Sequence, residues 1–200
     1  MKAPYSVAAC VVAVLALGAG PITDQKPVTR LINRPTPSPA PASTELLWAW
    51  ADAVVDARVV GNTVRERFPD STRLDPDLAT EYSFHVSEVL KQSQGHPISR
   101  TVSVVFPGGV KEYPDRILEI VQEGFPPPQK GASLVLFLRW SRSKDSYIPL
   151  HGPEGVFDVS GDRVQSPGQS AMARSNAGKS VATFLRELRM TKDKAKCPNP

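Results

Sequence analysis

Cysteine is scarce in this chain, with two residues among 200. Cys10 lies in an apolar N-terminal stretch and Cys197 lies three residues from the end. Two cysteines cannot supply the framework of a small disulfide-stapled scaffold. If the N-terminal stretch is removed, Cys197 remains alone and no intrachain disulfide can form. The folded part must then be held by its hydrophobic core.

Long apolar runs are also scarce. The longest, Val7–Leu17, has about 11 residues, whereas a membrane-spanning helix needs about 20. A polytopic membrane protein is thereby excluded. Lys2 precedes this run and the small residues Gly18–Gly20 follow it, which is the order of a secretory signal peptide. We expect a signal peptide over residues 1–18 and a protein that is secreted or held in the cell envelope. An uncleaved anchor is the alternative.

Neither sign of charge dominates, because the chain has 24 Lys and Arg and 20 Asp and Glu, which gives a formal net charge of +4. The positive excess lies after Arg174, where basic residues outnumber acidic ones. A nucleic-acid-binding domain would carry its basic patch across the folded part. We therefore expect no specific nucleic-acid partner, and a basic disordered tail over residues 191–200. Weak attraction of this tail to anionic polymers is an alternative source of binding.

Proline, by contrast, is abundant, with 20 residues. Six of them lie between residues 19 and 42, and the last of these alternate with small residues. Such a stretch is typical of a semi-rigid extended spacer. We expect residues 19–42 to be a proline-rich linker with no folded element. The folded domain is expected over residues 43–190.

Ser43 is a good helix N-cap, and Leu47, Trp50, Ala51 and Val54 follow it at helical spacing, so these four side chains are expected to share a buried face. After this helix, apolar and polar residues alternate as in β-strands. A bulge is expected at Glu88-Val89. Gln165–Asn176 is expected to be a loop. Strands are expected over 53–64, 82–87, 101–106, 117–121, 134–138, 147–150 and 156–159, a loop over 65–76, and a C-terminal amphipathic helix carrying Val181, Phe184, Leu185 and Leu188.

The run Leu134–Leu138 is continuously apolar, which predicts a strand buried on both faces. Many short strands with few helices indicate a small barrel or sandwich. The fold class expected is mainly β, a small barrel with a short N-terminal helix and a C-terminal amphipathic helix. A helix lying on a membrane is the alternative reading of the last element.

Four stretches carry a family resemblance: Ala51–Val60, Glu88–Lys91, Phe106–Gly109 and Lys130–Leu138. They resemble an uncharacterised group of exported bacterial domains with an OB-fold-like barrel, distantly similar in fold to tissue inhibitors of metalloproteases and to netrin-like modules. The resemblance covers residues 46–159 and implies an OB-like β-barrel. The inhibitors use an N-terminal cysteine that approaches a protease zinc. This chain has no cysteine at its expected mature start.

No pattern of catalytic chemistry is found. His85, His96 and His151 lie far apart, and no HExxH or CxxC motif is present. Ser170 stands in a stretch that lacks the second glycine of a nucleophile elbow, and Ser141–Lys144 matches SxxK only by its letters. Gly178-Lys179-Ser180 lacks the first glycine of a phosphate loop. Trp140, Tyr147, Arg139 and Arg142 are near one another and could line an open barrel face.

We therefore expect an exported, non-catalytic binding or interaction domain, not an enzyme. No catalytic residue, cofactor or metal ligand is expected, and the sequence leaves the ligand-binding residues unknown. A protein or an envelope component is the expected partner, and a monomer the expected state. The alternatives are a protease-inhibitor-like module and a secreted hydrolase whose catalytic residues are scattered, with His85 or His151 beside a carboxylate in a deep pocket.

Overall fold

The computed structural model describes residues 26–33, 39–67, 77–93 and 95–196, and the fold is mainly β. The predicted signal peptide and both cysteines lie outside the described residues. In chain order the elements are β1 (Val28–Asn33), α1 (Thr44–Trp50), β2 (Ala53–Arg67), β3 (Asp77–Gln92), β4 (Thr101–Pro107), β5 (Gly109–Glu112), β6 (Ile117–Gln122), β7 (Ser133–Ser141), β8 (Ser146–Pro149), the 3-10 helix η1 (Gly152–Gly155), β9 (Val156–Asp158), α2 (Ala171–Asn176) and α3 (Val181–Lys196).

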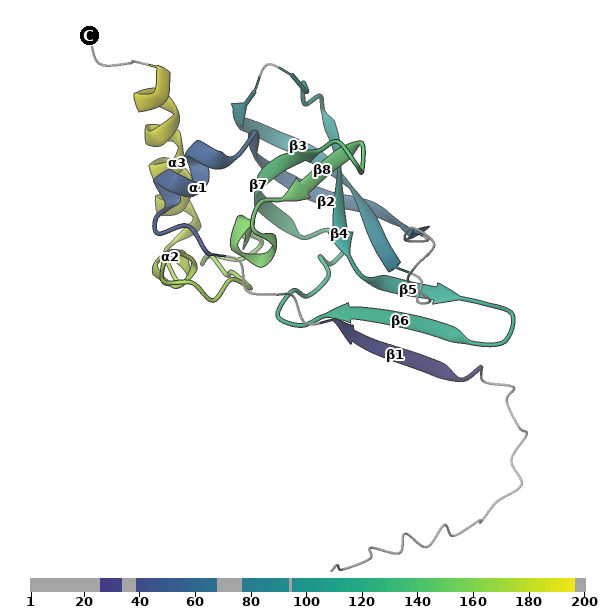
Figure 1. Ribbon diagram of the computed structural model, residues 1–200. Coiled ribbons are helices and arrows are strands. Elements are labelled where there is room, and N and C mark those ends of the chain that lie inside the picture. Colours follow the sequence, from purple (N-terminus) through teal and green to yellow (C-terminus); the bar gives the residue numbers. More distant parts are fainter. Residues whose placement is uncertain (1–25, 34–38, 68–76, 94, 197–200) are drawn as a thin grey trace, which may run out of the picture.

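Five strands pair into a ring. β2 pairs antiparallel with β3 and also with β7, and β3 pairs antiparallel with β4. β4 and β8 are parallel neighbours at Val104 and Tyr147, and β8 returns antiparallel to β7. β9 pairs with the first half of β7. Figure 1 shows this ring with the three α-helices on one side and a second, smaller sheet below it.

Side-chain alternation along the ring strands builds two cores. On β7, Leu134, Leu136 and Leu138 belong to a cluster that also contains Phe84 of β3, whereas Val135 and Phe137 belong to a cluster with the helices. Successive side chains of a strand point to opposite faces, so β7 contributes side chains to both cores. The prediction that Leu134–Leu138 is buried on both faces is confirmed.

The helices cover the outer face of β7 and β2. Ser43 caps α1 as predicted, its hydroxyl accepting from the Leu46 amide at 3.3 Å. One prediction for α1 is wrong: Trp50 is 50% exposed, and Trp48 is the buried tryptophan. The buried face of α1 consists of Leu47 and Trp48, which pack in the same cluster as Phe137 of β7. Packing against β7 therefore decides which tryptophan is buried, and helical spacing alone does not predict it.

The irregularity predicted at Glu88-Val89 is present. The register of β2 against β3 shifts on either side of the pairs Val55–Val89 and Asp56–Glu88. A bulge increases the local bend and twist of a strand. Here it lies in two strands of 15 and 16 residues that must curve around the ring.

The second sheet has three strands in the order β1-β6-β5. β1 runs parallel to β6 in continuous register, and β5 pairs antiparallel with β6. The expectation of no folded element in residues 19–42 is therefore wrong for Val28–Asn33. These six residues contain no proline and include three β-branched side chains, which favours a strand. β5 was not expected either.

Three further boundaries differ from the prediction. Ala171–Asn176, expected to be part of a loop, is the helix α2, and α3 continues past residue 190 to Lys196, into the segment expected to be a disordered tail. β2 also extends to Arg67, beyond the expected strand end at residue 64. Of the described helices, none has the length and apolarity needed to cross a membrane.

Candidate functional site

A cavity of about 370 Å³ lies between the ring and the three-stranded sheet, which we call the inter-sheet cavity. Its volume is within the range of small-ligand sites. The ring contributes residues of β2, β3 and β4, and the smaller sheet contributes β5 and β6. The lining residues are Asn62, Val64, Thr80, Tyr82, Phe106, Pro107, Gly108, Gly109, Val110, Glu119, Ile120, Val121, Gln122, Phe125 and Pro127.

Three aromatic side chains form one wall of this cavity. The rings of Tyr82 and Phe106 meet edge to face at 5.2 Å between centroids, and Phe106 and Phe125 are also 5.2 Å apart. All three are at most 5% exposed. Edge-to-face rings pack rigidly and offer a large apolar surface. The wall is therefore preformed by the core of the ring.

Tyr82 brings a polar group to this aromatic wall. Burial raises the pKa of the Tyr82 hydroxyl above its ordinary value of 10.0, and a hydrogen bond with the Asn62 side chain acts in the opposite direction. The hydroxyl is therefore neutral at physiological pH. A neutral phenol beside an amide can both donate and accept hydrogen bonds.

A pair of glycines allows β5 to leave the ring beside the cavity. Gly108 has φ +86°, and a Cβ there would lie 2.5 Å from the carbonyl oxygen of Ile120. Gly109 has φ +153°, and a Cβ there would lie 2.6 Å from the Thr80 hydroxyl. That hydroxyl donates to the Gly108 carbonyl at 2.7 Å, and the Gly108 amide donates to Leu78 at 2.8 Å. The start of β5 is thus fixed against β3, and no other residue type fits both positions.

The ionisable groups of this cavity are few. Tyr82 and Glu119 are the titratable residues among its lining, which contains no histidine, lysine, cysteine or serine. Glu119 forms an ion pair with Arg30 of β1 at 3.4 Å. General acid–base or nucleophilic chemistry requires a nucleophile within reach of a base. The described lining can hold a ligand by apolar contact and hydrogen bonds but does not assemble such a pair.

A second hollow, of about 460 Å³, lies beside the connector after β6. Pro126, Pro127 and Pro128 line one side, and residues of β7, β9 and the following loop line the other. It has no aromatic ring in its lining. The inter-sheet cavity is the stronger candidate because aromatic surface and convergent polar groups occur there together.

The residues considered for a barrel-face site come together only in part. Trp140 and Tyr147 meet edge to face at 5.1 Å, and the Tyr147 hydroxyl donates to the His96 carbonyl at 2.6 Å. Arg139 and Arg142 are exposed. The His96 ring stacks on Trp140 at 3.9 Å between ring centroids, with 13° between the planes, a contact that was not predicted from the sequence. His96 lies in the loop before β4 and Trp140 lies in β7, 44 residues later in the chain, so no local pattern signalled this contact.

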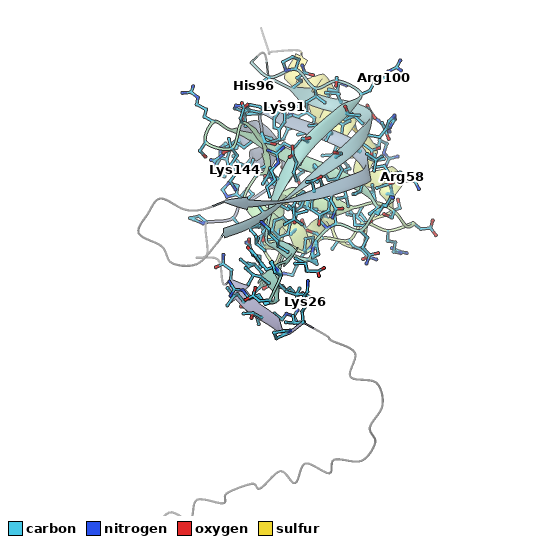
Figure 2. The ribbon with its side chains drawn as sticks, turned by 90° about the vertical axis from the view of Figure 1, so that its right-hand side faces the viewer. Lys26, Arg58, Lys91, His96, Arg100 and Lys144 are labelled. Atoms are coloured by element: carbon cyan, nitrogen blue, oxygen red, sulfur yellow. The ribbon has the colours of Figure 1, made fainter. Side chains whose placement is uncertain are left out.

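The histidines do not gather into a catalytic site. His85 is exposed on β3, and the His96 ring stacks on the Trp140 ring. The His151 ring lies 5.5 Å from the Trp50 ring, measured between centroids. None of them lines the inter-sheet cavity. Figure 2 shows His96 and Lys91 at the upper end of the ring, with Lys26 at the opposite end beside the small sheet. Within the described residues no cluster of three His, Cys, Asp or Glu could hold a metal ion.

Ser170, the serine whose sequence context most resembles a nucleophile motif, uses its hydroxyl in hydrogen bonds that stabilise the local fold. Its hydroxyl accepts from the Ala173 amide at 3.1 Å as the N-cap of α2, and it donates to Glu154. The other oxygen of Glu154 accepts from the Gln169 and Ser170 amides at 2.9 and 3.1 Å. This hydroxyl is committed to capping. Ser141–Lys144 forms the turn between β7 and β8, in which the Lys144 amide donates to the Ser141 carbonyl at 3.1 Å, and it is not part of an α-helix.

Comparison with known proteins adds no family: no protein-family model matches this chain, and a search of curated proteins gives no significant match.

Proposed function

We propose that the protein is an exported, non-catalytic binding module whose ligand enters the inter-sheet cavity. The observation that carries this proposal is the lining itself, an aromatic wall with hydrogen-bonding groups and no nucleophile–base pair. Such a surface binds an apolar group that carries one or two polar atoms. The apolar side chain of a partner protein or of an envelope component has this chemistry.

We further propose that the ring is an OB-like barrel. Five strands in Greek-key order are the framework of that fold, and its members bind ligands on the barrel face and its rim loops. The pairings β2-β3-β4-β8-β7-β2 support this assignment. Export is supported by the N-terminal order of a basic residue, an apolar run and small residues.

Affinity capture with two matched variants tests the binding proposal. Val110 lines the cavity and is 54% exposed, so Val110→Arg places a charge at the mouth at little cost to the fold. Val60 is 47% exposed on β2 and does not line the cavity, so Val60→Arg is the control. Each purified protein is immobilised and exposed to the secreted and envelope fraction at low and high salt.

We expect a component retained by the wild type and by Val60→Arg at both salts. At least about tenfold less should be retained by Val110→Arg, because a ligand seated at the mouth would have to remove the arginine charge from water. Equal retention by the two variants would contradict binding at this cavity. Capture restricted to low salt would instead support the basic C-terminal segment as the binding element.

A further inference from the structure

The outer edge of β1 is unpaired among the described strands. β1 is the terminal strand of the three-stranded sheet, and its partner β6 lies on its inner side. Figure 1 shows β1 along the lower margin of the molecule, away from the ring. An edge strand offers a row of backbone donors and acceptors to any strand that can align with it.

The hydrogen bonds to β6 fix which backbone groups face outward. The amides of Ile117 and Glu123 donate to the carbonyls of Pro27 and Asn33, both at 2.9 Å. Backbone groups alternate in direction along a strand, so the odd-numbered residues of β1 face β6. The even-numbered residues turn their N–H and C=O groups to the open edge. These are Val28, Arg30 and Ile32.

This edge carries few of the features that normally prevent edge pairing, which are proline, bulges and several charges. β1 contains no proline, its register against β6 has no shift, and Arg30 is its one charged residue. Val28 and Ile32 are each 62% exposed. Two β-branched side chains thus flank one arginine on an open, regular edge.

We propose that β1 pairs antiparallel with β1 of a second copy of this chain, about a two-fold axis through Arg30. The outward positions read apolar, arginine, apolar, and this order is the same in both directions. Antiparallel pairing centred on Arg30 therefore sets Val28 opposite Ile32 of the second copy, and Ile32 opposite its Val28. Cross-strand pairs of β-branched residues are favourable, and both copies satisfy the same outward backbone groups.

The charges near the two-fold axis sum to zero across the proposed junction. The two Arg30 side chains would face each other, which alone is unfavourable. Each arginine, however, carries the Glu119 of its own β6, with 3.4 Å between the charged groups. Across the joined sheets the order is Glu119, Arg30, Arg30, Glu119, which sums to zero. The ion pair is partly exposed, so its removal costs little in the single chain and much more at this junction.

The dimer goes beyond the proposed function and does not depend on it, because no cavity residue other than Glu119 takes part. It also differs from the monomer expected from the sequence. Pairing joins two three-stranded sheets into one of six strands and leaves each inter-sheet cavity with its own ring.

Sedimentation equilibrium of the purified protein over a range of concentrations tests the proposal. Ile32→Pro removes an outward N–H and places the proline ring in the path of the second strand. It leaves the β1–β6 bonds, which come from odd-numbered residues, in place. Ile32→Ser, which keeps the N–H, is the matched control.

We expect the wild type to have about twice the mass of one chain. Ile32→Pro should raise the dimer dissociation constant at least about tenfold and more than Ile32→Ser does, since two backbone bonds are lost per dimer. Glu119→Gln should also weaken the dimer, and less at high salt, with circular dichroism unchanged. A wild type that stays monomeric throughout, or an Ile32→Pro variant that dimerises like the wild type, overturns the proposal.

A cysteine placed on the axis keeps the proposal testable if the proline variant does not fold. In a chain with Cys10→Ser and Cys197→Ser, Arg30→Cys brings two thiols together at a Cα separation of about 5.5 Å, which a disulfide can bridge. Thr29→Cys is the control, because each Thr29 would face Leu31 of the second copy. We expect a disulfide-linked dimer for Arg30→Cys alone. Equal cross-linking of both variants, or of neither, overturns the proposed register.

Discussion

At the scale of single residues, Asp56 of β2 is a partly buried carboxyl outside the cavity. Burial raises the pKa of this carboxyl, the neighbouring Glu88 carboxylate raises it further, and Arg189 of α3 lowers it in part. Arg189 forms hydrogen bonds to Glu88 at 3.1 and 2.8 Å. The Arg189 guanidinium is thus hydrogen-bonded to Glu88, and its charge only partly offsets the effect of burial and of Glu88 on the Asp56 carboxylate.

This environment predicts a pH-dependent gain from Asp56→Asn. Because the folded pKa lies above the ordinary 3.8, the wild type loses stability as pH rises through the interval between these two values. The loss is complete above the folded pKa. We expect Asp56→Asn to raise the free energy of unfolding at pH 7, by less than about 1 kcal/mol because the group is partly solvated.

Urea unfolding at pH 7 and at about pH 2.5 measures this effect, which should fall toward zero at the lower pH, where the Asp56 carboxyl is protonated in both the folded and the unfolded state. Asp162→Asn, on an exposed turn, is the control and should change stability by no more than about 0.5 kcal/mol at either pH. A variant at Asp56 less stable than the wild type at pH 7 would show that Arg189 dominates this carboxylate.

At the scale of elements, α3 is held to the ring by one buried side. Phe184 and Leu188 are at most 1% exposed, and the Phe184 ring lies 5.1 Å from Phe157 of β9. Lys192 extends the contact by donating to the Val89 carbonyl at 3.0 Å. The spacing of apolar residues predicted this face, and the packing against the ring is what makes a 16-residue helix stable.

Phe184→Ala should therefore be severely destabilising. Removing a fully buried aromatic ring leaves a cavity in the outer core, and such changes cost about 3–5 kcal/mol. Met190→Ala on the same helix, at a position 53% exposed, should cost no more than about 0.5 kcal/mol. Thermal unfolding of both variants measures the difference. Similar melting temperatures for the two would mean that α3 does not contribute to the cooperative core.

Elements with strong local signals were predicted from the sequence, and those that depend on distant partners were not. Leu134–Leu138 and the helix beginning at Ser43 carry their own patterns. β1 has the β-branched residues of a strand, but its partner in the sheet is β6, which lies about 90 residues later in the chain. α2 is short, and its N-terminus is completed by Glu154, which belongs to η1. Propensity alone does not detect such nonlocal partners.

At the scale of the whole molecule, the ring and the three-stranded sheet differ in burial. β7 has strand neighbours on both edges, and its residues Leu134–Leu138 are at most 3% exposed. The β5–β6 sheet carries side chains that are mostly partly exposed. Regions with fewer buried contacts open more readily.

Hydrogen exchange should reveal this difference. We expect the amides of β7 to exchange at the slowest rates and those of the β5–β6 hairpin at least about tenfold faster. Exchange followed by mass spectrometry of peptides from the two regions measures it. Equal protection of both would show that the small sheet is part of the same cooperative unit as the ring.

The sequence by itself determined the mainly β character, the first helix cap, the doubly buried strand and the apolar face of the last helix, because each is written in the order of neighbouring residues. Tertiary structure alone decided that residues 28–33 join a sheet, that Trp48 and not Trp50 is buried, and that Tyr82, Phe106 and Phe125 form one wall of a cavity. The physical reason is common to all three. Each depends on strand pairing or packing between residues far apart in the chain, which local pattern does not encode.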